Sequence, residues 1–166
     1  MLERPYHRIA FMSLLMLFPV GAYAKSTTIN DITLDVPDGY KISSSKRGIL
    51  VKSPDGEVDV WVETFAGSDS HTLLTEHSNY WKKENVELGE PTTTMGKSGE
   101  ADVEKTNFPT ATWKGEPTVL RYSAIGPFGS QKEMLLVTYW ASPTGDQQYG
   151  DSIAKMVGDI NFKYPK

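Results

Sequence analysis

The stretch Lys132–Ala141, KEMLLVTYWA, decides the fold that this sequence predicts. Residues 134–137 are apolar in succession, and Tyr139 and Trp140 follow, so both sides of an extended segment would be apolar. Such a run is typical of a central strand that is covered on both faces. We therefore expect a sheet built around this strand, with further structure packed against each side.

Shorter β-rich segments supply the rest of the sheet. In the segment before the central strand, Leu120 and Tyr122 alternate with Arg121 and Ser123, and a hairpin loop is expected at 126–129. Two Pro-Asp-Gly turns mark the beginning of an antiparallel meander, because Pro presets the turn and Gly takes the positive φ. The valines of the segment 58–63 alternate with polar residues and Trp61, so they should form its buried side. The expected upstream strands are 29–36, 48–52, 58–63, 92–94, 102–106 and 110–113.

Two amphipathic helices are expected between and after these strands. The first starts at 68–70, ends near Asn85, and repeats apolar or aromatic residues at three-to-four spacing. The second starts with a capping box of Thr144 and Gln147, and Gly150 and Gly158 weaken it by about 1 kcal/mol each. The fold class is therefore α+β, an antiparallel sheet with two amphipathic helices. The apolar stripes are Leu73, Leu74, His77, Tyr80 and Trp81 in the first helix, and Tyr149, Ile153, Met156, Val157 and Ile160 in the second.

The first 24 residues, MLERPYHRIAFMSLLMLFPVGAYA, have the layout of a secretory signal peptide. A short basic head precedes the apolar stretch 9–20, and Ala22 and Ala24 provide the small-x-small pattern of a cleavage site. The apolar stretch is shorter than the roughly 20 residues that a transmembrane helix needs. We therefore expect cleavage after Ala24, a periplasmic or secreted location, and a single α+β domain at 25–166 that does not insert into a membrane.

Charge and the lack of cysteine exclude several classes of protein. The chain has 17 basic and 21 acidic residues, and loss of the leader would leave 15 and 20, a net charge of −5. A mildly acidic surface argues against binding to nucleic acid and against docking on anionic lipid. Without cysteine the chain forms no disulfide, no thiolate zinc site and no lipid-modified N-terminus. Its stability must come from an ordinary apolar core.

Five stretches follow one another in a distinctive order: VPDGY at 36–40, SPDGEVDVWV at 53–62, TATWKGEP at 110–117, LLVTYW at 135–140 and INFK at 160–163. This layout resembles the PsbP-like group, which includes PsbP-type accessory proteins of photosystem II and DcrB-like bacterial envelope proteins. The resemblance covers roughly 32–163 and is one of layout, with no site residue that transfers. It implies an α/β/α sandwich around an antiparallel sheet and a role in binding rather than catalysis.

Motifs for catalysis, cofactors or metals are lacking in the sequence. His71 and His77 are the only histidines after the leader, and six residues on a helix turn them to different faces. A zinc-protease helix needs histidines four apart, and no serine lies in Gly-x-Ser-x-Gly. Lys97 follows a glycine, but Pro91 stands where a phosphate-binding loop needs its first glycine. We predict no catalytic residue, no cofactor and no metal.

Two features are candidate sites for a partner. Acidic residues dominate 84–104, and a hairpin there would crowd them at one end. Such a cluster could be a docking surface for a basic partner, a weak calcium site, or a charged edge that resists aggregation. Phe128 at the tip of the expected loop could anchor a partner, unless its ring folds onto the core. Trp61, on the polar side of the strand 58–63, is a second candidate anchor. The candidate residues are Trp61, Glu87, Glu90, Glu100, Asp102, Glu104 and Phe128.

The function predicted is therefore that of a non-enzymatic, soluble periplasmic binding or accessory protein that contacts another envelope protein or a protein delivered to the envelope. A narrower form is an immunity protein that neutralises a delivered toxin. A second possibility is a carrier of a small apolar ligand, which needs a pocket of about 300 Å³ or more between sheet and helix. A third is a small hydrolase, which needs a polar cluster around His71 or His77 inside a cleft.

Overall fold

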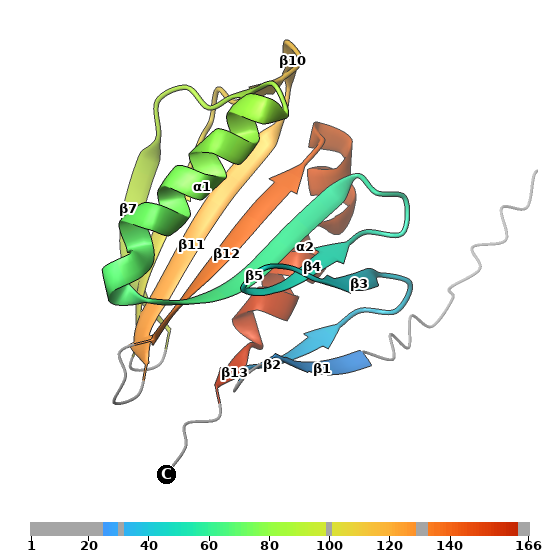
Figure 1. Cartoon of the computed structure of the whole chain (residues 1–166). Helices are drawn as coiled ribbons and strands as arrows, with labels where there is room; N and C mark the ends of the chain where they lie inside the picture. The colour runs from blue at the N-terminus through green and yellow to red at the C-terminus, as the bar shows by residue number, and fades with distance from the viewer. Residues whose placement is uncertain (1–24, 30–31, 99–100, 129–132, 163–166) are drawn as a thin grey trace, which may run out of the picture.

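The computed structural model describes residues 25–29, 32–98, 101–128 and 133–162. A seven-stranded antiparallel sheet dominates it, in the order β3-β4-β5-β12-β11-β8-β7 (Figure 1). The middle strand is β12, Glu133–Ala141, and residues 135–139 are all buried, as the apolar run predicted. The other strands of this sheet are β3 Lys41–Ser44, β4 Gly48–Lys52, β5 Val58–Ala66, β7 Thr92–Ser98, β8 Ala101–Asn107 and β11 Val119–Phe128.

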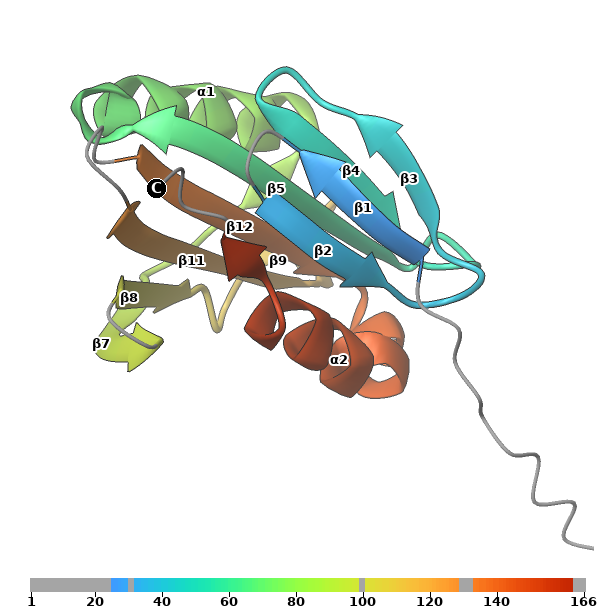
Figure 2. The same cartoon turned by 90° about the horizontal axis from the view of Figure 1, so that it is seen from below.

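Two helices lie on opposite faces of this sheet (Figures 1 and 2). The first, α1, Ser70–Lys83, follows the short 3-10 turn η1, Gly67–Asp69, and the second, α2, Pro143–Gly158, follows β12. Side chains alternate between the faces of a strand, so β12 supplies both cores. The α+β class with two amphipathic helices is confirmed. Under α1 the buried residues include Leu73, Trp81, Leu120 and Leu136, and on the α2 side they include Val60, Val137, Ile153 and Met156.

Two smaller sheets complete the fold. One has the order β1-β2-β13 and lies on the α2 side, where Leu34 and Val36 join the same core as Met156. The other has the order β10-β9-β6 and follows α1. Their strands are β1 Lys25–Ile29, β2 Ile32–Val36, β13 Asn161–Phe162, β6 Val86–Glu87, β9 Thr112–Trp113 and β10 Glu116–Pro117.

Some local predictions were wrong. The expected strand 29–36 is a hairpin of β1 and β2, in which Ile29 faces Ile32. The expected loop at 126–129 starts later, because β11 continues to Phe128, which pairs with Glu133. The connection between them falls outside the described residues, as does the leader 1–24.

The cap of α2 also differs from the prediction. Ser142, and not Thr144, is the N-cap: its Oγ accepts the backbone N–H of Gly145 at 2.9 Å, with Pro143 at the first helical position. Proline fits there because that position needs no N–H donor. A Cβ on Gly145 would lie 2.8 Å from the carbonyl oxygen of Glu57, so the glycine permits the start of α2 to approach the turn before β5. This tertiary contact positions the cap.

Candidate functional site

A groove of about 550 Å³ lies beside α2, on the sheet face that this helix covers in part. In Figure 2, α2 lies against one half of the sheet, with β8 and β7 to the left of it. One wall is α2, where Gly150, Ala154 and Gly158 are four residues apart and therefore share a face. The other wall is the edge strand β7, and the floor is made by β8, β11 and β12. We call this site the α2 groove.

The strand register arranges the floor of the α2 groove in three rows. Residues directly opposite one another in antiparallel strands point to the same face, so each row collects one residue from β8, β11 and β12. Along four residues of β11, about 13 Å, the floor changes from polar to apolar. The first row is Asn107, Arg121 and Tyr139, the second is Lys105, Ser123 and Val137, and the third is Val103 and Ile125, whose partner on β12, Leu135, is fully buried and does not line the groove.

Among the described residues that line the α2 groove, three have cationic side chains and none has a carboxylate. Lys105 and Arg121 belong to the floor rows, whereas Lys97 lies opposite Asp102, in register with the other face of the sheet. Two of the cations already have partners. Arg121 holds Asp146 with both guanidinium arms at 2.8 Å, and Lys97 Nζ lies 2.6 Å from Asp102 Oδ1. No acidic side chain in the described part of the chain pairs with Lys105. The groove therefore offers one unpaired positive charge in a protein whose net charge is −4.

The polar end of the groove is held in place by α2. The hydroxyl of Tyr139 donates to Asp146 Oδ1 at 2.9 Å, so Asp146 joins α2 to both β11 and β12. Burial, and then the hydrogen bond to Asp146, raise the pKa of Tyr139 well above its ordinary value. The Tyr139 hydroxyl is therefore a protonated donor at neutral pH, and Arg121 is held at a fixed place in the floor.

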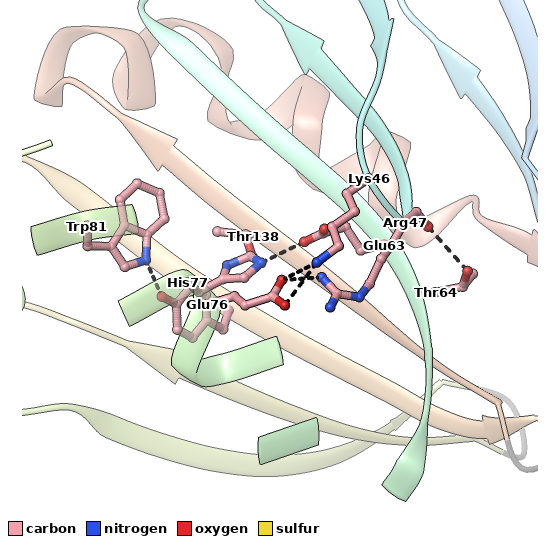
Figure 3. A network of polar contacts seen from close by, with 9 residues as sticks. Lys46, Arg47, Glu63, Thr64, Glu76, His77, Trp81 and Thr138 are labelled. Carbon is pink, nitrogen blue, oxygen red and sulfur yellow. Dashed lines mark hydrogen bonds and ion pairs between the residues drawn. The ribbon is translucent and has the colours of Figure 1, made fainter. Parts of the chain in front are cut away.

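A second polar cluster lies on the opposite face of the sheet, under α1 (Figure 3). His77 Nε2 lies 2.6 Å from Glu63 Oε2 on β5, and its Nδ1 lies 3.4 Å from Thr138 Oγ1 on β12. Hydroxyl, imidazole and carboxylate follow one another here as they do in nucleophilic hydrolases. Thr138 is, however, fully buried, and none of the three lines the α2 groove. The cluster joins α1 to two strands and gives a substrate no access to the hydroxyl.

Two further interactions hold α1 on the sheet. Arg47 Nη1 and Lys46 Nζ lie 2.7 and 3.0 Å from the carboxylate of Glu76, and these cations lower the pKa of Glu76 to about 2. Further along the helix, the indole N–H of Trp81 donates to the hydroxyl of Tyr122, and burial raises the pKa of Tyr122 to about 12. Together with His77, these contacts anchor one face of α1 along its length.

Trp61 belongs to the packing under α1. Its ring centroid lies 5.7 Å from that of Trp81, 5.8 Å from that of Tyr80 and 6.5 Å from that of Trp140. The same strand face was expected to be half open to water, and this was wrong, because Asp59 is 8% exposed and Glu63 is 5% exposed. Helix α1 covers this face, so the partner role of Trp61 stays a prediction for a half-buried side chain.

The candidate acidic residues are spread out rather than crowded. Strands β7 and β8 pair with Thr92 opposite Asn107 and Lys97 opposite Asp102, so Asp102 lies near the turn of this hairpin. Glu87 lies in the small sheet, opposite Thr112, and Glu90 precedes the far end of β7. The expected crowding at one end is therefore wrong. Glu104 lies between these ends, opposite Met95, while Glu100 and the side chain of Phe128 lie outside the described residues.

Local sequence patterns do not identify the residues of the α2 groove. Arg121 is predicted as a polar position in a strand, Gly150 and Gly158 as weak points in a helix, and Lys105 only as part of the expected strand 102–106. The repeated small residues at Gly150, Ala154 and Gly158 were the available signal, because a helix face without side-chain bulk cannot fill the space beside it. The floor itself had no such signal, since its rows join residues that are far apart along the chain.

Comparison of the sequence with protein-family models and with curated proteins gives no match. The fold, in contrast, is similar to solved structures. One is the cyanobacterial PsbP, CyanoP, from Synechocystis sp. PCC 6803, with a TM-score of 0.61 and 6% identity over 90% of this chain and 99% of that one. Another is LpqN, which is involved in cell envelope biogenesis of Mycobacterium tuberculosis, with a TM-score of 0.54 and 12% identity over 87% of each chain. The chain therefore has the PsbP-like layout that its sequence resembles.

Proposed function

We propose that this chain is a non-catalytic binding protein of the cell envelope, and that the α2 groove is its binding site. The observation that carries the proposal is a groove of about 550 Å³, with an apolar end and an unpaired lysine. Pockets of 300–1,000 Å³ with an apolar lining and a few placed polar groups are typical ligand sites. The groove exceeds the volume required for a carrier of a small apolar ligand, so we favour the carrier form over contact with a protein.

The lining of the groove supports binding without catalysis. Among the described residues, no histidine and no carboxylate lines it, so a general base with an ordinary pKa near neutrality is lacking there. The constellation at His77 that resembles a hydrolase has its hydroxyl, Thr138, fully buried beneath α1. The immunity role has no specific observation in its favour.

A protein partner is the second candidate, and the edge strand β7 favours it. Residues 92–97 are all exposed, and Met95 is 69% exposed. An exposed edge strand can accept a strand from another protein. Such a partner would bind at the rim of the sheet, whereas a carried ligand would lie between sheet and helix.

The envelope location is supported by the leader and by the similarity to LpqN. Within the part of the chain that the structure describes, no helix has the length and hydropathy to cross a membrane. Cell fractionation with intact-mass measurement tests the location: a periplasmic species that starts at Lys25 is expected. The full-length mass in the cytosol would contradict it.

The binding role is tested by capture from the envelope fraction, followed by mass spectrometry of bound lipids and proteins. Ala154→Trp fills the α2 groove, and Leu74→Ala alters an exposed position on α1, on the other side of the sheet. We expect a molecule that accompanies the wild type and L74A and is lost from A154W. If A154W remains folded and retains everything that the wild type retains, the groove is not the binding site.

A further inference from the structure

The polarity of the α2 groove narrows the class of ligand, and this inference rests on the function proposed above. Three observations matter: the direction in which the floor becomes apolar, the charge left unpaired, and the length of the α2 wall. Each restricts the occupant differently.

The direction of the floor selects a ligand with two unlike ends. At one end lie Asn107 and Arg121, and at the other lie Val103 and Ile125, with Lys105 in the row between them. The α2 wall follows the same order. A Cβ on Gly150 would lie 4.0 Å from the hydroxyl of Tyr139, and α2 then runs back alongside β12 toward its start (Figure 1). Val157 and Gly158 therefore line the apolar end.

The charge of the groove selects a single anion. Arg121 and Lys97 are neutralised by Asp146 and Asp102, so Lys105 is the cation without a carboxylate partner among the described residues. The titratable side chains of the floor rows are Lys105, Arg121 and Tyr139, and no described lining residue has a carboxylate that would repel an anion. The protein as a whole is acidic, whereas the lining of the groove has a local excess of positive charge.

The length of the wall indicates an extended tail. From Gly150 to Gly158 the helix rises by eight residue steps, about 12 Å along its axis, with Ala154 between them on the same face. This length matches the roughly 13 Å of floor between Arg121 and Ile125. An extended acyl chain suits a groove of this length, whose floor is apolar at one end.

We propose that the α2 groove binds a monoanionic amphiphile with one acyl chain, a fatty carboxylate. The carboxylate lies at Lys105, beside the polar side chains of Asn107 and Ser123, and the acyl chain runs over Val103 and Ile125 toward Val157. Binding is reversible and involves no covalent step.

The test is a titration of the purified protein with decanoate below its micelle concentration, followed by isothermal titration calorimetry and amide chemical shifts. The matched probe is 1-decanol, which has the same chain and no charge. We expect decanoate to shift the amides of Val103, Lys105, Ile125 and Ala154, and to bind more tightly than decanol.

Two charge variants and one filling variant locate the site. Lys105→Met keeps the aliphatic stem and removes the ammonium, so decanoate should bind about tenfold more weakly or worse, since hydrogen bonds to charged groups are the strong ones. Lys155→Met makes the same change of charge on an exposed part of α2 outside the groove and should bind as the wild type does. A154W should lose both probes, and unchanged circular dichroism shows that it is folded.

Each outcome decides between the two proposals. If decanoate does not bind, or shifts amides outside the groove, the inference is wrong. If decanol binds as well and K105M has no effect, the anionic head is wrong although groove binding stands. If the envelope molecule that A154W loses is a protein, the amphiphile is wrong and the binding role stands. If neither probe nor captured molecule depends on Ala154, both proposals fall.

Discussion

Replacing His77 by leucine should destabilise the protein strongly. The partner of His77, Glu63, has a side chain only 6% exposed, and the two atoms that meet are 2.6 Å apart. His77→Leu keeps the apolar contacts of α1 but leaves the carboxylate buried without its imidazole. Removing one member of a buried ion pair typically costs 3–5 kcal/mol.

The cost arises because the buried carboxylate loses its hydrogen-bond partner and gains no contact with water, while leucine offers it no donor. The loss in free energy of unfolding should therefore lie in the range of about 3–5 kcal/mol at pH 7.

Urea unfolding at pH 7, monitored by tryptophan fluorescence, measures this loss. The double variant E63L/H77L should recover most of the stability, because replacing a buried pair by apolar residues is often neutral. Lys97→Met is the control, since its ion pair is 64% and 55% exposed and should contribute less than about 1 kcal/mol. A loss below about 1 kcal/mol for H77L, or a double variant that is as unstable as H77L, would refute the argument that an unpartnered buried carboxylate is responsible.

Three further outcomes are expected. Glu76→Gln should cost stability at neutral pH but not near pH 2: the folded pKa of Glu76 is lowered from 4.5 to about 2, so its contribution is present above pH 4.5 and is lost as the pH falls toward 2. Urea midpoints of wild type and E76Q that stay equally far apart from pH 7 to 2 would contradict this. Ser142→Ala should cost about 1 kcal/mol by thermal unfolding and Thr144→Ala less than about 0.5 kcal/mol, because Ser142 is the N-cap of α2. A larger loss for Thr144→Ala would show that the helix is capped by the box of Thr144 and Gln147 instead. Gly145→Ala should cost about 1–3 kcal/mol, because the added Cβ would lie 2.8 Å from the backbone of Glu57. Gly158→Ala should be neutral or slightly stabilising, because its Cβ would have no atom within 4 Å. Equal melting temperatures for the two variants would show that the turn before β5 moves aside.

Much of the fold could be predicted from local sequence. The unbroken apolar run of β12 requires cover on both faces, and this alone placed it at the centre of the sheet. The Pro-Asp-Gly turns set the strand ends, since Gly39 and Gly56 adopt φ values of 84° and 81° that other residues rarely take. The three-to-four spacing of Leu73, His77 and Trp81 similarly required a helix with one buried face.

The candidate site depended on contacts that no local pattern reports. Periodicity says which side of a strand is apolar, but not which element covers it, so the side of β5 with Asp59 and Glu63 was expected to face water and lies instead under α1. Glu63 and His77 are 14 residues apart in the sequence. Lys105 lies on β8 and Ala154 on α2, and the strands β11 and β12 come between them along the chain.

Sequence by itself therefore determined the elements, the antiparallel class and the central strand, because these follow from side-chain period and turn chemistry. Tertiary structure alone decided where an opening remains. The α2 groove exists because one helix with small residues at positions 150, 154 and 158 is too narrow to cover the sheet out to β7, and the rows beneath it are assembled by strand register across residues 103–139.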